Sequence, residues 1–131
     1  MLSSCRVLVV EDEPLVAEHL MDLLTDAEAI VIGPIATMSA ARQLVRNGTE
    51  IDVALLDLNL GDGSVTPLLE ALTARHVPTL VYTGGVVPEP VRKRHPDLVV
   101  LTKPVAPARL TAELRRVTRS AAARPMGAPA E

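Results

Sequence analysis

Short apolar runs alternate with longer segments of helical periodicity along almost the whole chain. The runs with the length and β-branched content of strands are residues 7–10, 29–32, 51–57, 78–83 and 98–102. The segment that begins at Pro14 places Val16, Leu20 and Leu24 on one helical face. The third run is almost continuously apolar, which is typical of a strand buried on both faces. This alternation predicts βα units on one parallel sheet.

Glycine and proline predict where several elements end. We expect the second strand to stop at Gly33-Pro34 and Ser39 to cap the helix that follows. Between the fourth and fifth strands, three prolines leave room for a short or distorted helix at most: Pro88, Pro90 and Pro96. The last helix is predicted over residues 107–120.

Length and composition predict one domain without a second module. A chain of 131 residues can bury a core of its own, and we expect a domain over residues 1–120 followed by a disordered tail over 121–131, which is rich in Ala and Pro. The net charge of -3 gives no electrostatic reason to expect nucleic acid or an anionic membrane, and the apolar run of residues 7–10 is too short to span a membrane. Cys5 is the single cysteine, so no disulfide or zinc spacing is present, and a cytoplasmic location is expected. Tyr82 is the only aromatic residue.

Reactive side chains stand where four of the predicted strands end. Asp57 closes the third run, residues 11–13 (Glu-Asp-Glu) follow the first, Thr83 closes the fourth and Lys103 follows the fifth. Parallel strands bring their carboxyl ends to one edge of the sheet, so these groups should converge there. An acidic cluster with a further carboxylate, a hydroxyl and an ammonium group indicates a magnesium-assisted phosphoryl site.

Four phrases, "VLVVEDEP", "LLDLNLGDGS", "LVYTGG" and "LTKP", follow one another along residues 5–120. In order and spacing they resemble the receiver domain of two-component response regulators. The resemblance implies an α/β fold, a flavodoxin-like (βα)5 doubly wound parallel sheet of strand order 2-1-3-4-5. It also implies that Asp57 is the phosphoacceptor, with Thr83 and Lys103 as the other two catalytic groups.

The same resemblance implies a cofactor and partners. Mg²⁺ would be bound directly by Asp12, Asp57 and the backbone carbonyl of Asn59, with Glu11 acting through a water. The donor would be a sensor histidine kinase or a histidine phosphotransfer protein. A stand-alone receiver of this kind signals to a downstream protein by protein–protein contact. It is a phosphoacceptor rather than an enzyme, although it assists its own phosphotransfer and dephosphorylation. The lysine is followed by Pro104, which resembles the family's cis Lys-Pro bond.

Two positions depart from the receiver pattern. Receivers usually carry Tyr or Phe three residues before the lysine, as a side chain that swings inward on phosphorylation, and here that residue is Val100. We therefore expect the response to appear in residues 84–96 instead. The segment "PTLVYTGG" is similar to the PFxFATG-type motif of a subgroup of stand-alone receivers, because it keeps Pro78, Thr83 and Gly84, but it lacks both Phe residues.

Alternatives remain for the chemistry. A haloacid-dehalogenase-type Mg²⁺ phosphatase would also use Asp57 as nucleophile, but its second aspartate would stand where this chain has Asn59. A flavodoxin would need a first loop that accepts phosphate, which three acidic residues repel. Individually, Asp12 could simply favour a helix N-terminus, and Thr83 could be an ordinary strand residue. The arginines of the last helix and tail form either a solvated face or a docking surface: Arg109, Arg115, Arg116, Arg119 and Arg124.

Overall fold

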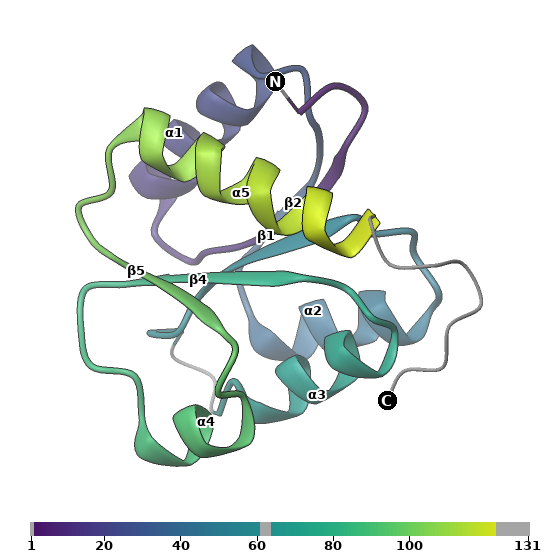
Figure 1. The fold of residues 1–131 in the computed structure, drawn as a ribbon, viewed down its shortest axis with the longest axis vertical. Coiled ribbons are helices and arrows are strands. Elements are labelled where there is room, and N and C mark those ends of the chain that lie inside the picture. Colours follow the sequence, from purple (N-terminus) through teal and green to yellow (C-terminus); the bar gives the residue numbers. More distant parts are fainter. Residues whose placement is uncertain (1, 61–63, 123–131) are drawn as a thin grey trace.

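The computed structural model describes residues 2–60 and 64–122 and contains one five-stranded parallel sheet. Its order, β2-β1-β3-β4-β5, confirms the predicted doubly wound arrangement. The strands are β1 (Arg6–Val10), β2 (Ile30–Ile35), β3 (Val53–Asp57), β4 (Thr79–Thr83) and β5 (Val99–Thr102). All five therefore present their carboxyl ends to the same edge (Figure 1).

Helices cover both faces of the sheet (Figure 1). One face is covered by α1 (Pro14–Asp26) and α5 (Pro107–Ala122). The other is covered by α2 (Met38–Arg46), α3 (Thr66–Ala74) and α4 (Glu89–Arg94). As predicted, the helix between the fourth and fifth strands is short, with six residues. No helix in the described part of the chain is both long and apolar enough to cross a membrane.

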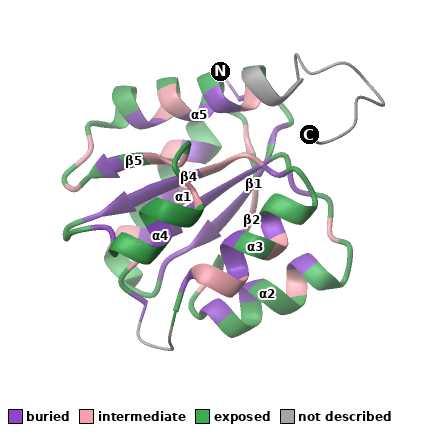
Figure 2. Ribbon diagram, turned by 60° about the horizontal axis from the view of Figure 1, so that its bottom comes forward, coloured by how far each residue is buried: buried purple, intermediate pink, exposed green. Residues whose placement is uncertain are grey.

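The core consists of two apolar layers separated by the sheet (Figure 2). Every residue of β3 is buried, as its continuous apolar sequence predicts. Side chains alternate along a strand, so Leu56 packs toward α2 and α3, whereas Leu55 packs toward α1 and α5. Both leucines are fully buried. Packing from two sides thus fixes where β3 ends, and with it the position of Asp57.

The second strand does not stop at Gly33-Pro34, as the sequence had suggested, but continues through it to Ile35. β2 lies at the edge of the sheet, where Pro34 interrupts no ladder on its outer side. The pairing with β1 shifts register between Leu8 and Val10, and the Gly33-Pro34 bond is cis. Gly33 has φ of +114°, and a Cβ there would lie 2.8 Å from the Val9 carbonyl oxygen. This close approach and the positive φ explain why glycine stands at this irregularity of the strand.

Two helix boundaries also differ from the predictions. Thr37, and not Ser39, caps α2, because its hydroxyl accepts a hydrogen bond from the Ala40 N–H at 3.1 Å. The earlier start lets Met38 pack into the core. α5 extends to Ala122, so the predicted tail falls mostly on residues 123–131, which lie outside the described residues.

Candidate functional site

Four strand ends meet at the carboxyl edge of the sheet. Asp57 is the last residue of β3 and Thr83 the last of β4, while Glu11 directly follows β1 and Lys103 directly follows β5. The strand register fixes their heights, since Asp57 lies opposite Tyr82 on the neighbouring strand. Backbone bonding extends this order beyond the strands, because the Lys103 N–H donates to the Thr83 carbonyl at 2.8 Å. The sheet therefore brings together the side chains that the sequence singled out.

Three carboxylates form the acidic part of the site. Glu11, Asp12 and Asp57 each place one oxygen within 4.8 Å of those of the other two. Glu11 and Asp57 are buried, whereas Asp12 is exposed. Like charges at this separation repel one another, and burial increases the cost. The cluster therefore requires positive charge nearby.

Lys103 supplies part of that charge. Its Nζ lies 3.0 Å from Asp57 Oδ2 and 3.4 Å from Glu11 Oε1. Burial by itself would lower the pKa of Lys103, but the hydrogen bond to Asp57 and the charges of Asp57 and Glu11 outweigh it, so the pKa is raised. With the three carboxylates ionised, one ammonium leaves two negative charges, which suits a divalent cation with a preference for hard oxygen ligands. The Lys103-Pro104 bond is cis, as the sequence implied.

A chain of hydrogen bonds connects Asp57 to Thr83. The Asn59 N–H donates to Asp57 Oδ1 at 2.9 Å, and Asn59 Nδ2 donates to Thr83 Oγ1 at 3.1 Å. The Gly85 N–H also donates to Thr83 Oγ1, at 3.1 Å. The buried Thr83 hydroxyl thus accepts two hydrogen bonds, and its own hydrogen is not used in either. It is more than an ordinary strand residue, because it joins the β3 end to the loop after β4.

Tyr82 belongs to the site although the sequence analysis gave it no role. Its hydroxyl donates to Glu11 Oε1 at 2.6 Å, and Lys103 Nζ lies 4.8 Å from the centre of its ring. Burial raises the pKa of Tyr82 far above its usual value, and the hydrogen bond to Glu11 and the nearby carboxylates raise it further. The hydroxyl therefore stays protonated and acts as a donor. A signal was present in the sequence, since a tyrosine in a buried strand needs a partner for its hydroxyl.

Comparisons with known proteins show the family of the chain. The family model for the response regulator receiver domain matches residues 7–115. The chain belongs to the response regulator receiver family. The solution structure of SdrG from Sphingomonas melonis Fr1 is 35% identical, with a TM-score of 0.73, and the match covers 91% of this chain and 99% of that one. No match is found among curated protein sequences.

Two more distant receivers share the fold. The CheY-like receiver from Methanospirillum hungatei JF-1 has 22% identity and a TM-score of 0.81, over 92% of this chain and 98% of that one. The receiver domain of the sensor histidine kinase PA1611 from Pseudomonas aeruginosa PAO1 has 21% identity and a TM-score of 0.76, over 89% and 99%. The latter structure holds a magnesium ion coordinated in its active-site cleft. Family membership favours the receiver over the haloacid-dehalogenase-type phosphatase and the flavodoxin.

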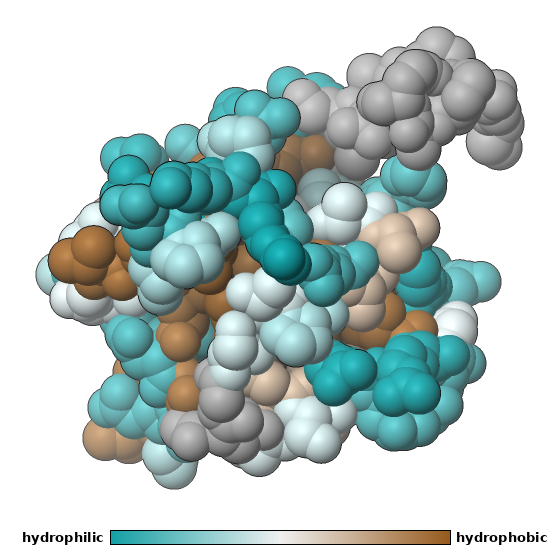
Figure 3. Space-filling model, turned by 90° about the horizontal axis from the view of Figure 1, so that it is seen from below, coloured by the Kyte–Doolittle hydropathy of each residue, from teal (hydrophilic) through white to brown (hydrophobic). Residues whose placement is uncertain are grey.

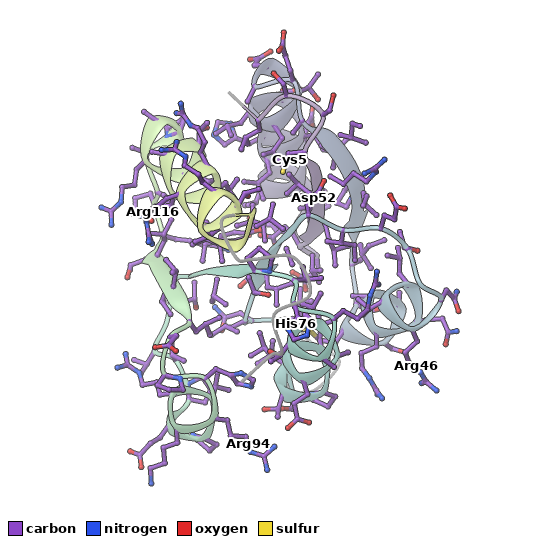
Figure 4. The ribbon with its side chains drawn as sticks, turned by 45° about the vertical axis from the view of Figure 1, so that its right-hand side comes forward. Cys5, Arg46, Asp52, His76, Arg94 and Arg116 are labelled. Carbon is purple, nitrogen blue, oxygen red and sulfur yellow. The ribbon has the colours of Figure 1, made fainter. Side chains whose placement is uncertain are left out.

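The side chains of Glu13, Cys5 and Asp52 are not part of the candidate site. Glu13 occupies the N-cap position of α1, and its side chain makes no capping hydrogen bond. Instead its N–H donates to Glu11 Oε2 at 3.0 Å. Cys5 and Asp52 precede β1 and β3 and lie together at the opposite, amino edge of the receiver sheet (Figure 4). Cys5 is buried with a free thiol, and burial raises its pKa, which makes it an unreactive core residue.

Proposed function

We propose that Asp57 accepts a phosphoryl group from a phosphohistidine of a sensor kinase or histidine phosphotransfer protein. A carboxylate oxygen of Asp57 would form a bond to phosphorus while the P–N bond of the donor breaks and the imidazole leaves with its electron pair. The observation that carries the proposal is the position of Lys103 Nζ, 3.0 Å from Asp57 Oδ2 inside the acidic cluster. A nucleophilic carboxylate with a cation and two further acids at its side matches the electrostatic needs of phosphoryl transfer.

In this proposal the cofactor is Mg²⁺. Asp12, Asp57 and the backbone carbonyl of Asn59 would bind it directly, and Glu11 through a water. The donor set fits the ion, because the clustered atoms are carboxylate oxygens and Asp12 is open to solvent. When bound, Mg²⁺ would neutralise charge on the phosphoryl oxygens. Asn59 donates hydrogen bonds through its N–H and its side chain, and the metal contact of its carbonyl stays a prediction.

Two side chains would form new contacts with the phosphoryl group once it is bound to Asp57. The ammonium of Lys103 would exchange its contact with Asp57 for one with a phosphoryl oxygen, since the attack removes the negative charge that now holds it. The hydroxyl hydrogen of Thr83 would be donated to another phosphoryl oxygen. Both movements are supported by the surroundings, because Lys103 is partly exposed and the Thr83 hydroxyl donates no hydrogen bond to any of the described residues.

The output surface we propose comprises residues 84–96, β5 and α5. Gly85 connects this surface to the site through its hydrogen bond to Thr83. Val86 and Val100 are exposed, at 86% and 37%. The space-filling view from the α4 side shows hydrophobic areas between hydrophilic ones (Figure 3). On α5, Arg109 and Arg116 both pair with Glu113, so part of the basic charge of that helix is already balanced. The side chain of Arg116 points away from the sheet (Figure 4).

Three further expectations belong to the proposal. The chain would act as a phosphoacceptor that assists its own phosphotransfer and dephosphorylation, and not as an enzyme on other substrates. The cytoplasm is its proposed location, based on a single free cysteine. Membership of the PFxFATG-type subgroup and the domain bounds of residues 1–120 stay predictions.

The test is intact mass after incubation with a small-molecule phosphodonor and Mg²⁺. The wild type should gain the mass of one phosphoryl group, and Asp57→Ala and Asp57→Asn should not. Asp52→Asn is the matched control, because it replaces an aspartate that directly precedes β3, at the opposite edge of the sheet. Undiminished labelling of Asp57→Asn, or a label mapped to Ser64 or Thr66, would overturn the assignment.

A further inference from the structure

Glu11 is held at both of its oxygens. Oε2 accepts from the Glu13 N–H, and Oε1 accepts from the Tyr82 hydroxyl and, at longer range, from Lys103 Nζ. The side chain of Glu11 is fully buried. At 2.6 Å the bond from Tyr82 has the length of a charge-assisted O–H···O⁻ bond, one of the stronger hydrogen bonds in proteins. The orientation of this carboxylate therefore depends on Tyr82.

The ring of Tyr82 contacts the other charged partner. Lys103 Nζ lies 4.8 Å from the ring centre, within the range of a cation–π interaction. Tyr82 also lines a cavity of about 480 Å³ between α1 and α5, together with Val16, Leu20 and Leu110. Tyr82 is thus placed between the acidic cluster and the apolar layer of α1 and α5. Its hydroxyl contacts the carboxylate of Glu11, and its ring contacts the ammonium group of Lys103.

We propose that Tyr82 is a positioning residue of the site. Its hydroxyl orients the Glu11 carboxylate for the metal, and its ring holds the Lys103 ammonium in place beside Asp57. This inference rests on the proposed function. A group that holds a metal ligand from outside fixes the direction of its lone pairs, and removal of such a partner typically costs ten- to a hundredfold in metal affinity. Because Glu11 is proposed to act through a water, we expect a loss of about tenfold, at the lower end of that range.

Two variants separate the hydroxyl from the ring. Tyr82→Phe keeps the ring beside Lys103 and removes the donor to Glu11, whereas Tyr82→Leu removes both. By calorimetry, both should bind Mg²⁺ about tenfold more weakly than the wild type. At saturating Mg²⁺, Tyr82→Phe should regain the wild-type rate of phosphoryl labelling, and Tyr82→Leu should remain slow. Urea unfolding of each variant verifies that it is folded, and Tyr82→Phe alone still tests the hydroxyl if Tyr82→Leu does not fold.

The wild type also carries a built-in spectroscopic readout. Tyr82 is the only aromatic residue, so all intrinsic emission comes from the site. The emission of a phenol that is hydrogen-bonded to a carboxylate changes when that hydrogen bond changes. Addition of Mg²⁺ should therefore change the tyrosine emission, with the same midpoint as the calorimetric Kd. In Asp12→Asn, which removes a proposed direct ligand, the change should disappear at the same concentrations.

The outcomes distinguish this inference from the proposed function. A wild type that binds Mg²⁺ and is labelled on Asp57, with equal Mg²⁺ affinity in Tyr82→Phe, overturns the positioning role and leaves the function intact. A tyrosine emission that does not change when Mg²⁺ binds also overturns the positioning role and leaves the proposed function intact. A wild type that neither binds Mg²⁺ nor accepts a phosphoryl group overturns both.

Discussion

Asn59 Nδ2 donates a hydrogen bond to Thr83 Oγ1 at 3.1 Å, and this contact joins the loop after β3 to the end of β4. Asn59 is exposed, while Thr83 is buried. The bond therefore lies at the boundary between solvent and core, next to Asp57, whose Oδ1 accepts from the Asn59 backbone. Any change at Asp57 that moves Asn59 also changes the bonding of Thr83 and, through it, of Gly85.

The first prediction concerns the stability of this link. Thr83→Val keeps the shape of the side chain but removes the acceptor for Asn59 and Gly85. Both donors are exposed and can bond to water, so the free energy of unfolding should fall by only about 1 kcal/mol. Urea denaturation measures the change. Thr83→Ser is the control, because it keeps the hydroxyl. The amide chemical shifts of Asn59 and Gly85 should stay close to the wild-type values in Thr83→Ser.

A second prediction separates the metal ligands from the lysine. Asp12→Ala should weaken Mg²⁺ binding by at least about tenfold, because it removes a proposed direct ligand. Lys103→Ala should leave Mg²⁺ affinity unchanged or slightly raised, since a nearby positive charge is lost, yet impair labelling. Calorimetric titration compares them, with Glu13→Gln as a control that removes a negative charge one residue further along. Equal losses of affinity in Asp12→Ala and Lys103→Ala would contradict this division.

The third prediction is a pH dependence. The pKa of Tyr82 is raised by folding, so its stabilising contribution is complete below the unfolded pKa of tyrosine, about 10, and is lost as the pH rises above that value toward the folded pKa. Urea midpoints should fall steeply above pH ~10 in the wild type and less steeply in Tyr82→Phe. Lys103 contributes in the same direction in both proteins, because its pKa is also raised. Equal slopes in the two proteins would show that Tyr82 does not contribute.

The fourth prediction tests the output surface. Phosphorylation should change hydrogen exchange in residues 84–96, where Gly85 is bonded to Thr83 and α4 has only six residues. Hydrogen exchange with and without a phosphoryl mimic measures this, with Asp57→Asn as the control that should show no change. Protection changes confined to residues 14–27 would place the response on α1 instead.

Much of the fold could be predicted because its signals are local. The apolar run of β3, the reactive residues at the strand ends and the prolines around α4 each indicate one element without reference to the others. The continuation of β2 through Gly33-Pro34 could not be predicted, because it depends on the edge position of that strand. The sequence also could not identify Glu11 as the hydrogen-bond partner of Tyr82. The two residues are 71 positions apart, and only the order of the strands brings β1 and β4 to the same edge of the sheet.

Gly33-Pro34 also has a consequence for how copies of this protein meet. An open sheet has two outer strands, and their unpaired N–H and C=O groups are templates for aggregation. On β2, Pro34 removes one donor and the positive φ of Gly33 interrupts the flat edge, so another strand has no continuous ladder to join. On the other side, β5 has only four residues and is followed at once by Lys103-Pro104. Both margins of the sheet thus discourage edge-to-edge pairing when the protein is concentrated.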